Sequence, residues 1–144
     1  AEAIAAGAQA TSSSAAARVE IEERIIELDY GELEGLPVRE VPPATWEAWR
    51  RDTTWRPVGG ESLDDLAVRV WAAFDELAGA AADPGARIAV VTHVSPIKAA
   101  VAWALGVGIE VQWRCFVEQA SITRIATPGG RPSLVSFNEV HHLA

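Results

Sequence analysis

His93 is the residue whose surroundings in the sequence most clearly suggest chemistry. It directly follows Arg87–Thr92, a run rich in β-branched residues that predicts a strand buried by helices on both faces. In open α/β folds, ligands bind where strands end, and the first N–H groups of the next helix attract anions. His93, the Val94 amide and the Ser95 hydroxyl therefore form a candidate site for a phosphate or carboxylate group. The alternative is a histidine that only makes local hydrogen bonds.

Carboxylates that could act with His93 lie in segment 24–35, which mixes strand-like and turn residues and predicts an irregular loop. Glu27 and Asp29 are close to Tyr30 in this loop, and a carboxylate that reached the same crevice as His93 could donate or accept a proton. The alternative is that these carboxylates are simply solvated, as most acidic residues are, and that Tyr30 belongs to the core.

Tryptophans and the C-terminal histidines offer two further candidates. Trp46, Trp49 and Trp55 would either line a pocket for an apolar part of a substrate or anchor the packing of the core. His141 and His142 are adjacent, and adjacent side chains on a strand point to opposite faces, so this pair does not predict a metal site. We expect neither a metal nor a cofactor.

Two helices are predicted around the candidate residues. Ser62–Asp65 has the pattern of a capping box, and apolar residues then recur at helical spacing as far as Leu77. A second helix is expected to have Ser95 as its N-terminal cap, Pro96 at its first position and Gly106 as its end. The candidate anion site would lie at the start of this second helix.

Shorter elements complete the predicted fold. Pro42-Pro43 precedes a short helix, Arg18–Glu22 alternates as a strand does, and residues 1–10 have the composition of the tail of a helix. Ser121–Ala126 and Ser133–Phe137 flank a turn and predict a hairpin. Strand, helix, strand, helix and hairpin in this order predict an α/β fold whose sheet is covered by helices on both faces.

Composition excludes several classes of protein. The 144 residues fit one domain, and 49% hydrophobic against 22% charged residues indicates a globular rather than a disordered chain. The longest apolar stretch, Ala99–Ile109, is well short of the ~20 residues that span a membrane. A net charge of −8 argues against nucleic acid as a partner. The single cysteine, Cys115, fits a reducing compartment, and we expect the cytoplasm.

Three motifs occur in order along the chain: R-x-x-E-x-D-Y-G-x-x-E-G from Arg24, G-G-E-S from Gly59, and V-V-T-H ending at His93. Together they resemble the histidine phosphatase superfamily, also called phosphoglycerate mutase-like, from Ala1 to about Asn138. The resemblance implies a three-layer sandwich with a mostly parallel sheet. It also implies hydrolysis of a small phosphomonoester through a phosphohistidine.

The resemblance assigns roles to individual residues. Glu27 matches the general acid that protonates the leaving oxygen, and His93 matches the histidine that stabilises the transferring phosphoryl group. Glu61, in the G-G-E-S turn, matches a structural rather than a catalytic residue. The residues implied to bind substrate or phosphate are Arg24, Tyr30, Val94 and Ser95.

Two motifs of the family are missing from the sequence: the Arg-His-Gly motif that carries the nucleophile, and the Ser-Ser-x-x-x-Arg-Ala segment that supplies another phosphate-binding arginine. Since the chain also has no methionine, we expect residues 1–144 to be the C-terminal portion of a domain truncated at its N-terminus. Ser95–Lys98 resembles a subgroup of phosphatases, some of which are fused behind a ribonuclease H domain. A homo-oligomer is compatible with the sequence.

Two alternative functions stay open. An inactive phosphatase-like module would bind an anionic ligand or a protein partner, and a mutase would move phosphate between positions of one acid. The segment between Gly35 and Gly59 is short for the substrate-closing insertion that such mutases carry, which favours hydrolysis.

Overall fold

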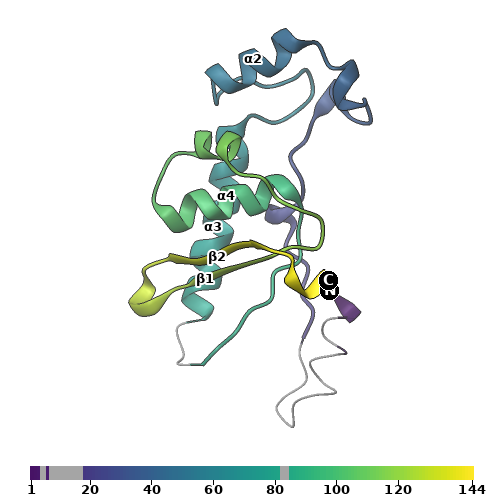
Figure 1. The fold of residues 1–144 in the computed structure, drawn as a ribbon. Coiled ribbons are helices and arrows are strands. Elements are labelled where there is room, and N and C mark those ends of the chain that lie inside the picture. Colours follow the sequence, from purple (N-terminus) through teal and green to yellow (C-terminus); the bar gives the residue numbers. More distant parts are fainter. Residues whose placement is uncertain (4–5, 7–17, 82–84) are drawn as a thin grey trace.

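The computed structural model describes residues 1–3, 6, 18–81 and 85–144. Its helices and strands are α2 (Pro43–Arg51), α3 (Leu63–Ala80), α4 (Val94–Leu105), β1 (Ile122–Ala126) and β2 (Ser133–Glu139). Helix α2 lies beyond one end of α3, and the β1–β2 hairpin lies toward the other end (Figure 1). The helix tail expected over residues 1–10 falls largely outside the described residues. In the described ranges, no helix combines the length and the apolar character that a membrane span requires.

Helix α3 begins as the sequence predicts. The Asp65 amide donates to the Ser62 hydroxyl at 3.1 Å, and the Ser62 amide donates to the Asp65 carboxylate at 3.0 Å. These reciprocal bonds satisfy N–H groups that the first turn of a helix otherwise leaves free. The buried residues of α3 are Leu63, Leu66, Ala67, Val70 and Ala73.

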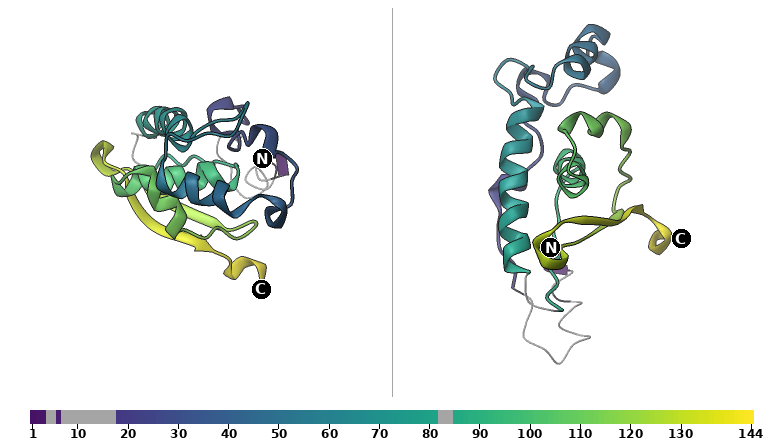
Figure 2. Two further views of the ribbon diagram at one scale, coloured as in Figure 1. Left: turned by 90° about the horizontal axis from the view of Figure 1, so that it is seen from above. Right: turned by 90° about the vertical axis from the view of Figure 1, so that its left-hand side faces the viewer.

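The core lies mainly between α3 and α4. Figure 2 shows the two helices side by side, with α4 running across α3. Ala99 and Ala102 of α4 are fully buried, and their small side chains let the helices approach closely. The predicted short helix α2 adds Trp49, which is 1% exposed. The other buried members of the cluster are Leu28, Leu63, Leu66, Ala67, Val70 and Ile109.

Helix α4 ends at Gly106 as predicted, but Ser95 is not its cap. The helix begins at Val94, its N-cap residue is His93, and Ser95 therefore occupies the second position. Gly106 has φ +65°, the left-handed conformation that favours glycine at the end of a helix. The prediction for Ser95 is wrong because the acceptor at this helix start comes from a distant loop: the Glu27 carboxylate accepts the Ser95 amide.

The C-terminal hairpin is confirmed. β1 and β2 pair antiparallel, with Ile122 opposite Glu139 and Ala126 opposite Ser133. The predicted Thr127–Gly130 turn contains a 3-10 turn at Pro128–Gly130. This two-stranded sheet is the sheet formed within the described residues.

The other predicted strands are not formed in the described part of the chain. Segment 86–93, which contains the expected strand Arg87–Thr92, is extended but pairs with no strand there, and Arg18–Glu22 is likewise unpaired. Ile88 is 45% exposed and Val91 is 52% exposed, so the expectation of burial on both faces is wrong for this structure. A β-branched run is buried only where other strands and helices flank it, and a local pattern does not supply those neighbours.

Candidate functional site

Glu27 reaches the first turn of α4 from a loop that precedes α2 in the sequence. Just before Glu27 is a 3-10 turn, Glu23–Ile25, and just after it the buried Leu28 anchors the loop in the core. The Glu27 Oε1 atom accepts the amide of Leu28 at 2.7 Å and the amide of Ser95 at 3.1 Å. A carboxylate at the start of a helix is stabilised by free N–H groups and by the positive end of the helix dipole.

A second contact joins the segments that carry Glu27 and His93, because the Thr92 hydroxyl donates to the carbonyl oxygen of Ile25. His93 and Val94 are exposed, whereas Ser95 is buried. The His93 side chain makes no capping hydrogen bond to α4. The start of α4 therefore combines an exposed imidazole, helix N–H groups and a carboxylate, which together can bind an anion and move a proton.

Tyr30 lies close to this helix start. Burial raises the pKa of the Tyr30 hydroxyl, a hydrogen bond with Ser95 lowers it, and the carboxylates of Glu27 and Glu34 raise it further. A raised pKa keeps the phenol protonated, so that it can donate a hydrogen bond to an oxygen atom nearby. Of the predicted site residues, the structure thus brings Glu27, Tyr30 and Ser95 together beside His93 and Val94.

Arg24 is placed differently from the other predicted site residues. Its guanidinium donates to Glu22 at 2.7 and 2.8 Å and to Glu76 of α3 at 2.7 and 2.8 Å. Hydrogen bonds from Arg24 lower the pKa of the Glu22 carboxyl from 4.5 to about 2. The charge of Arg24 is therefore already matched by two carboxylates on this side of the loop.

Sequence analysis missed Arg69, whose guanidinium holds the loop that carries Glu27. Arg69 donates to the backbone carbonyl oxygens of Arg24, Ile26 and Glu27, at 2.7, 2.9 and 3.1 Å. It also forms an ion pair with Glu61 at 2.6 Å. A signal was available: Arg69 immediately precedes the core residue Val70, and a charged group next to the apolar face of a helix requires partners.

A cavity of about 180 Å³ opens next to the helix start. Val94, Ser95 and Lys98 of α4 line it together with Tyr30 and Trp46. Its remaining lining residues are Leu28, Trp49, Leu63, Gln112 and Trp113. This cavity gives an anion bound at the start of α4 an adjoining space for the rest of a small molecule.

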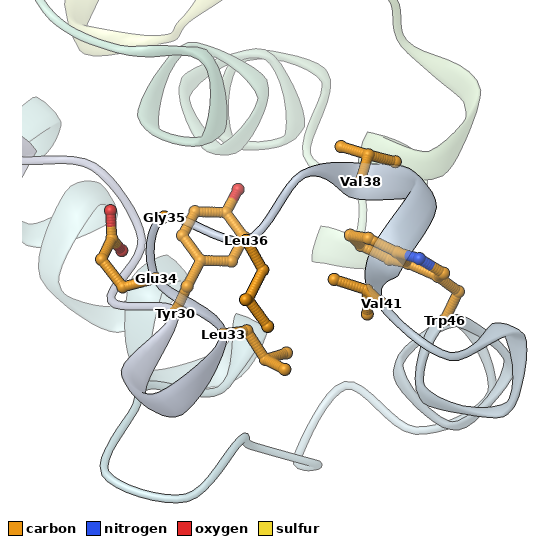
Figure 3. A pocket seen from close by; sticks show the side chains of 8 residues that line it. All are labelled: Tyr30, Leu33, Glu34, Gly35, Leu36, Val38, Val41 and Trp46. Carbon is orange, nitrogen blue, oxygen red and sulfur yellow. The ribbon is translucent and has the colours of Figure 1, made fainter.

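Tyr30 and Trp46 also line a second cavity, of about 210 Å³. Figure 3 shows Tyr30, Leu33 and Leu36 on one side of this cavity and Val38, Val41 and Trp46 on the other. Trp46 stacks on the buried Trp49 with ring centroids 5.9 Å apart. Trp49 thus anchors the core, as one of the two alternatives expected, and Trp46 lines both cavities, while a contact of the tryptophans with a substrate stays a prediction.

In the described ranges, no three His, Cys, Asp or Glu side chains lie together so that they could hold a metal ion. His141 and His142 have ring centroids 6.1 Å apart, and the His142 Nε2 atom lies 2.9 Å from the Ala120 carbonyl oxygen.

Comparison with known sequences gives matches over most of the chain. The sequence model described as histidine phosphatase superfamily (branch 1) matches residues 3–140. A bifunctional protein of Mycobacterium tuberculosis is 35% identical over 108 residues, which are 73% of this chain and 29% of that protein. A 2,3-bisphosphoglycerate-dependent phosphoglycerate mutase of Methylobacterium radiotolerans is 38% identical over 85 residues, 56% of this chain and 40% of that protein.

Comparison with solved structures gives a similar α/β fold. A mycobacterial glucosyl-3-phosphoglycerate phosphatase, solved in complex with VO3, superimposes with a TM-score of 0.73 at 26% identity. The match covers 85% of this chain and 66% of that phosphatase. The chain thus spans less than a third of the bifunctional relative and about two thirds of the solved phosphatase.

Proposed function

Because the chain belongs to the histidine phosphatase superfamily, we propose that it supplies the general acid and a phosphate-binding histidine for the hydrolysis of a small phosphomonoester. Glu27 is the general acid, and His93 stabilises the transferring phosphoryl group. The observation that carries the proposal is the 3.1 Å hydrogen bond from the Ser95 amide to the Glu27 carboxylate. It holds an acidic group at the same helix start as His93, although the two residues are far apart in the sequence.

The chemistry follows from this arrangement. Phosphoryl transfer depends mainly on positioning and on positive electrostatics around the equatorial phosphoryl oxygens, which the His93 ring, the Val94 amide and the Ser95 hydroxyl would provide. The leaving oxygen needs a proton. Glu27 Oε1 accepts two amides, whereas Oε2 is 3.5 Å from the Ser95 amide and is better placed to carry that proton.

Tyr30 and Arg24 differ in how far the structure supports their roles. Tyr30 lines the cavity beside Ser95, so we assign it to the binding of the leaving group. A phosphate-binding role for Arg24 stays a prediction, since Glu22 and Glu76 occupy its guanidinium.

The nucleophile of the proposed reaction is a histidine in an Arg-His-Gly motif, and none of the three histidines of this chain stands in one. We therefore assign the nucleophile to polypeptide beyond these 144 residues, together with the strands that would complete a mostly parallel, three-layer sheet along segment 86–93. The reading frame upstream of Ala1 tests this assignment. A frame that encodes Arg-His-Gly supports it, whereas a natural start site at Ala1 would favour an inactive binding module.

Leaving-group dependence is the test of the general acid, measured on the natural gene product. Glu27→Gln should slow the hydrolysis of alkyl phosphates far more than that of aryl phosphates, because only the poorer leaving group needs a proton. Glu32→Gln is the matched control, since Glu32 is an exposed carboxylate of the same loop, and it should leave both rates unchanged. Equal losses on the two substrate classes in Glu27→Gln would contradict the role of Glu27.

Product analysis separates the alternatives. A phosphatase releases inorganic phosphate, a mutase returns an isomeric phosphate ester, and an inactive module binds inorganic phosphate or vanadate without turnover. The cytoplasm is the compartment we propose for this activity, because the one cysteine, Cys115, offers no internal disulfide.

A further inference from the structure

Glu27 is anchored to the two principal helices of the core through two different groups. Its carboxylate accepts the Ser95 amide of α4 at 3.1 Å, and its carbonyl oxygen accepts the Arg69 guanidinium of α3 at 3.1 Å. The first contact belongs to the proposed general acid itself. The second contact is made by a residue that the proposed reaction does not use.

Arg69 binds the backbone on the N-terminal side of Glu27 as well. Its Nη1 atom donates to the carbonyl oxygens of Arg24 at 2.7 Å and Ile26 at 2.9 Å. Arg24 lies in the short 3-10 turn and Ile26 directly follows it, and the backbone hydrogen bonds of this turn run to the carbonyl oxygens of Glu22 and Glu23 rather than to those of Arg24 and Ile26. Hydrogen bonds from a charged guanidinium are stronger than those from neutral groups, so Arg69 fixes the path of the loop where secondary structure does not.

Glu61 orients Arg69 and holds the loop on the other side of Glu27. Its carboxylate accepts Arg69 Nε at 2.6 Å and Nη2 at 2.8 Å, a two-pronged contact that fixes the plane of the guanidinium. The Glu61 backbone amide donates to the carbonyl oxygen of Asp29 at 2.9 Å, and its carboxylate accepts the Asp29 amide at 3.2 Å. The side chains of Arg69 and Glu61 are 20% and 15% exposed, which limits competition from water.

We propose that Arg69, oriented by Glu61, is the positioning residue for Glu27. It contacts no substrate and instead fixes the backbone from Arg24 to Asp29 so that the Glu27 carboxyl group faces the leaving oxygen. This inference rests on the proposed function, because it assumes that Glu27 is the general acid. A displacement of about 1 Å at a catalytic group can lower a rate ~100-fold, so a residue of this kind has a measurable effect.

Arg69→Met tests the proposal in the natural gene product. The variant keeps much of the length of the side chain and removes every donor, and we expect kcat to fall ~10- to 100-fold more on an alkyl phosphate than on an aryl phosphate. Arg69→Lys keeps the charge without the planar fork and should lie between Arg69→Met and the wild type. Arg56→Met is the matched control, since Arg56 pairs with Asp65 near the start of α3 at 2.9 Å. It should show no selectivity between the substrates.

A double variant shows whether Arg69 acts through Glu27. If it does, Glu27→Gln/Arg69→Met should be no slower on the alkyl phosphate than Glu27→Gln alone. Equal losses on both substrates, or additive losses in the double variant, would assign Arg69 a merely structural role and overturn the proposal. If circular dichroism shows that Arg69→Met does not fold, Glu61→Gln decides the question by the same comparison of substrates. Failure of the proposed function itself is distinguishable, because Glu27→Gln alone would then show no leaving-group dependence.

Discussion

His93 and Glu27 occupy the same helix start but are held in different ways. Glu27 is fixed through its carboxylate and its carbonyl oxygen, whereas His93 is exposed at the N-cap of α4 and makes no capping bond with its side chain. This difference matches the proposed division of labour. A general acid must be aimed at one oxygen atom, while the exposed His93 ring and the N–H groups of the helix start can donate to several phosphoryl oxygens.

His93→Ala is expected to lower phosphomonoesterase activity ~10²- to 10³-fold, the usual loss for one donor to developing negative charge. The fold should stay intact, because His93 is exposed and its side chain caps nothing. Turnover of a phenyl phosphate by the natural gene product measures the effect, with circular dichroism as the check on folding. His142→Ala is the control, and turnover near the wild-type level in His93→Ala would show that the residue is misassigned.

The ion pairs of Arg24 make the stability of the folded chain depend on pH. Arg24 lowers the pKa of the Glu22 carboxyl from 4.5 to about 2 and also lowers the pKa of Glu76. Both carboxylates therefore hold protons less tightly in the folded chain than in the unfolded one. Their contribution to stability is present above their ordinary pKa and is lost as the pH falls through the folded value.

The free energy of unfolding, measured at decreasing pH, should show this dependence on the two carboxylates. We expect stability to decline between about pH 4.5 and about pH 2, and we expect Arg24→Met to make that decline shallower. Urea denaturation at a series of pH values measures both slopes. Arg18→Met should keep the wild-type slope, since the Arg18–Glu20 pair at 3.3 Å is highly exposed. A slope unchanged in Arg24→Met would refute the coupling.

At the level of elements, two glycine-containing loops pack backbone against backbone near the site. The Glu32 amide donates to the Val58 carbonyl oxygen at 3.0 Å, and Gly31 has φ +51°. A Cβ atom on Gly31 would lie 2.3 Å from the Val58 carbonyl oxygen and 2.5 Å from the Gly60 nitrogen. The loop with Tyr30-Gly31 and the loop with the G-G-E-S motif thus contact each other through backbone atoms, with no room for a side chain between them. This contact places Glu61 opposite Asp29.

Gly31→Ala is therefore expected to destabilise the protein more than Gly35→Ala. Both positions are left-handed, with φ +51° and +75°, so each alanine costs ~1–2 kcal/mol in backbone strain. Gly31→Ala should cost a further ~1–3 kcal/mol, because its clash is with backbone, whereas nothing lies within 4 Å of the Cβ position at Gly35. Chemical denaturation of the two variants measures the difference. Equal losses would show that the loops can separate.

At the scale of the whole molecule, two segments that pair with no strand in the described ranges, residues 18–26 and 86–93, carry exposed apolar side chains. Ile21 is 92% exposed and Ile26 62% exposed in one segment, and Ile88 and Val91 are about half exposed in the other. Unpaired backbone beside apolar side chains favours association with another strand. We therefore expect residues 1–144, expressed alone, to self-associate and to lack phosphatase activity.

Sedimentation velocity tests this expectation. Ile88→Lys/Val91→Lys should shift the chain toward monomer, because lysine on an unpaired strand opposes edge-to-edge pairing. Val68→Lys is the control, since Val68 is 71% exposed on helix α3, whose backbone groups are already paired within the helix. A monomeric 144-residue chain that hydrolyses phosphomonoesters would overturn both the self-association and the assignment of the nucleophile to a missing segment.

The sequence alone determined the elements that depend on local chemistry. The capping box at Ser62, the apolar spacing of α3, the glycine that ends α4 and the turn between β1 and β2 each act within a few residues. Helical hydrogen bonds and tight turns join residues close in sequence, so their signals are readable without the rest of the molecule. Each of the three motifs also spans only a few residues, so the motifs and their order could be found in the sequence and indicated the family.

Tertiary structure alone decided the contacts between distant segments. The Glu27 carboxylate replaces a local cap at Ser95, Arg24 pairs with Glu76 of another element, and Arg69 gathers the carbonyl groups of a loop more than forty positions away. The exposure of Arg87–Thr92 likewise depends on which strands lie beside it. Each of these contacts forms because the packing of α3 and α4 brings distant residues together. A local pattern of residue types does not identify such partners.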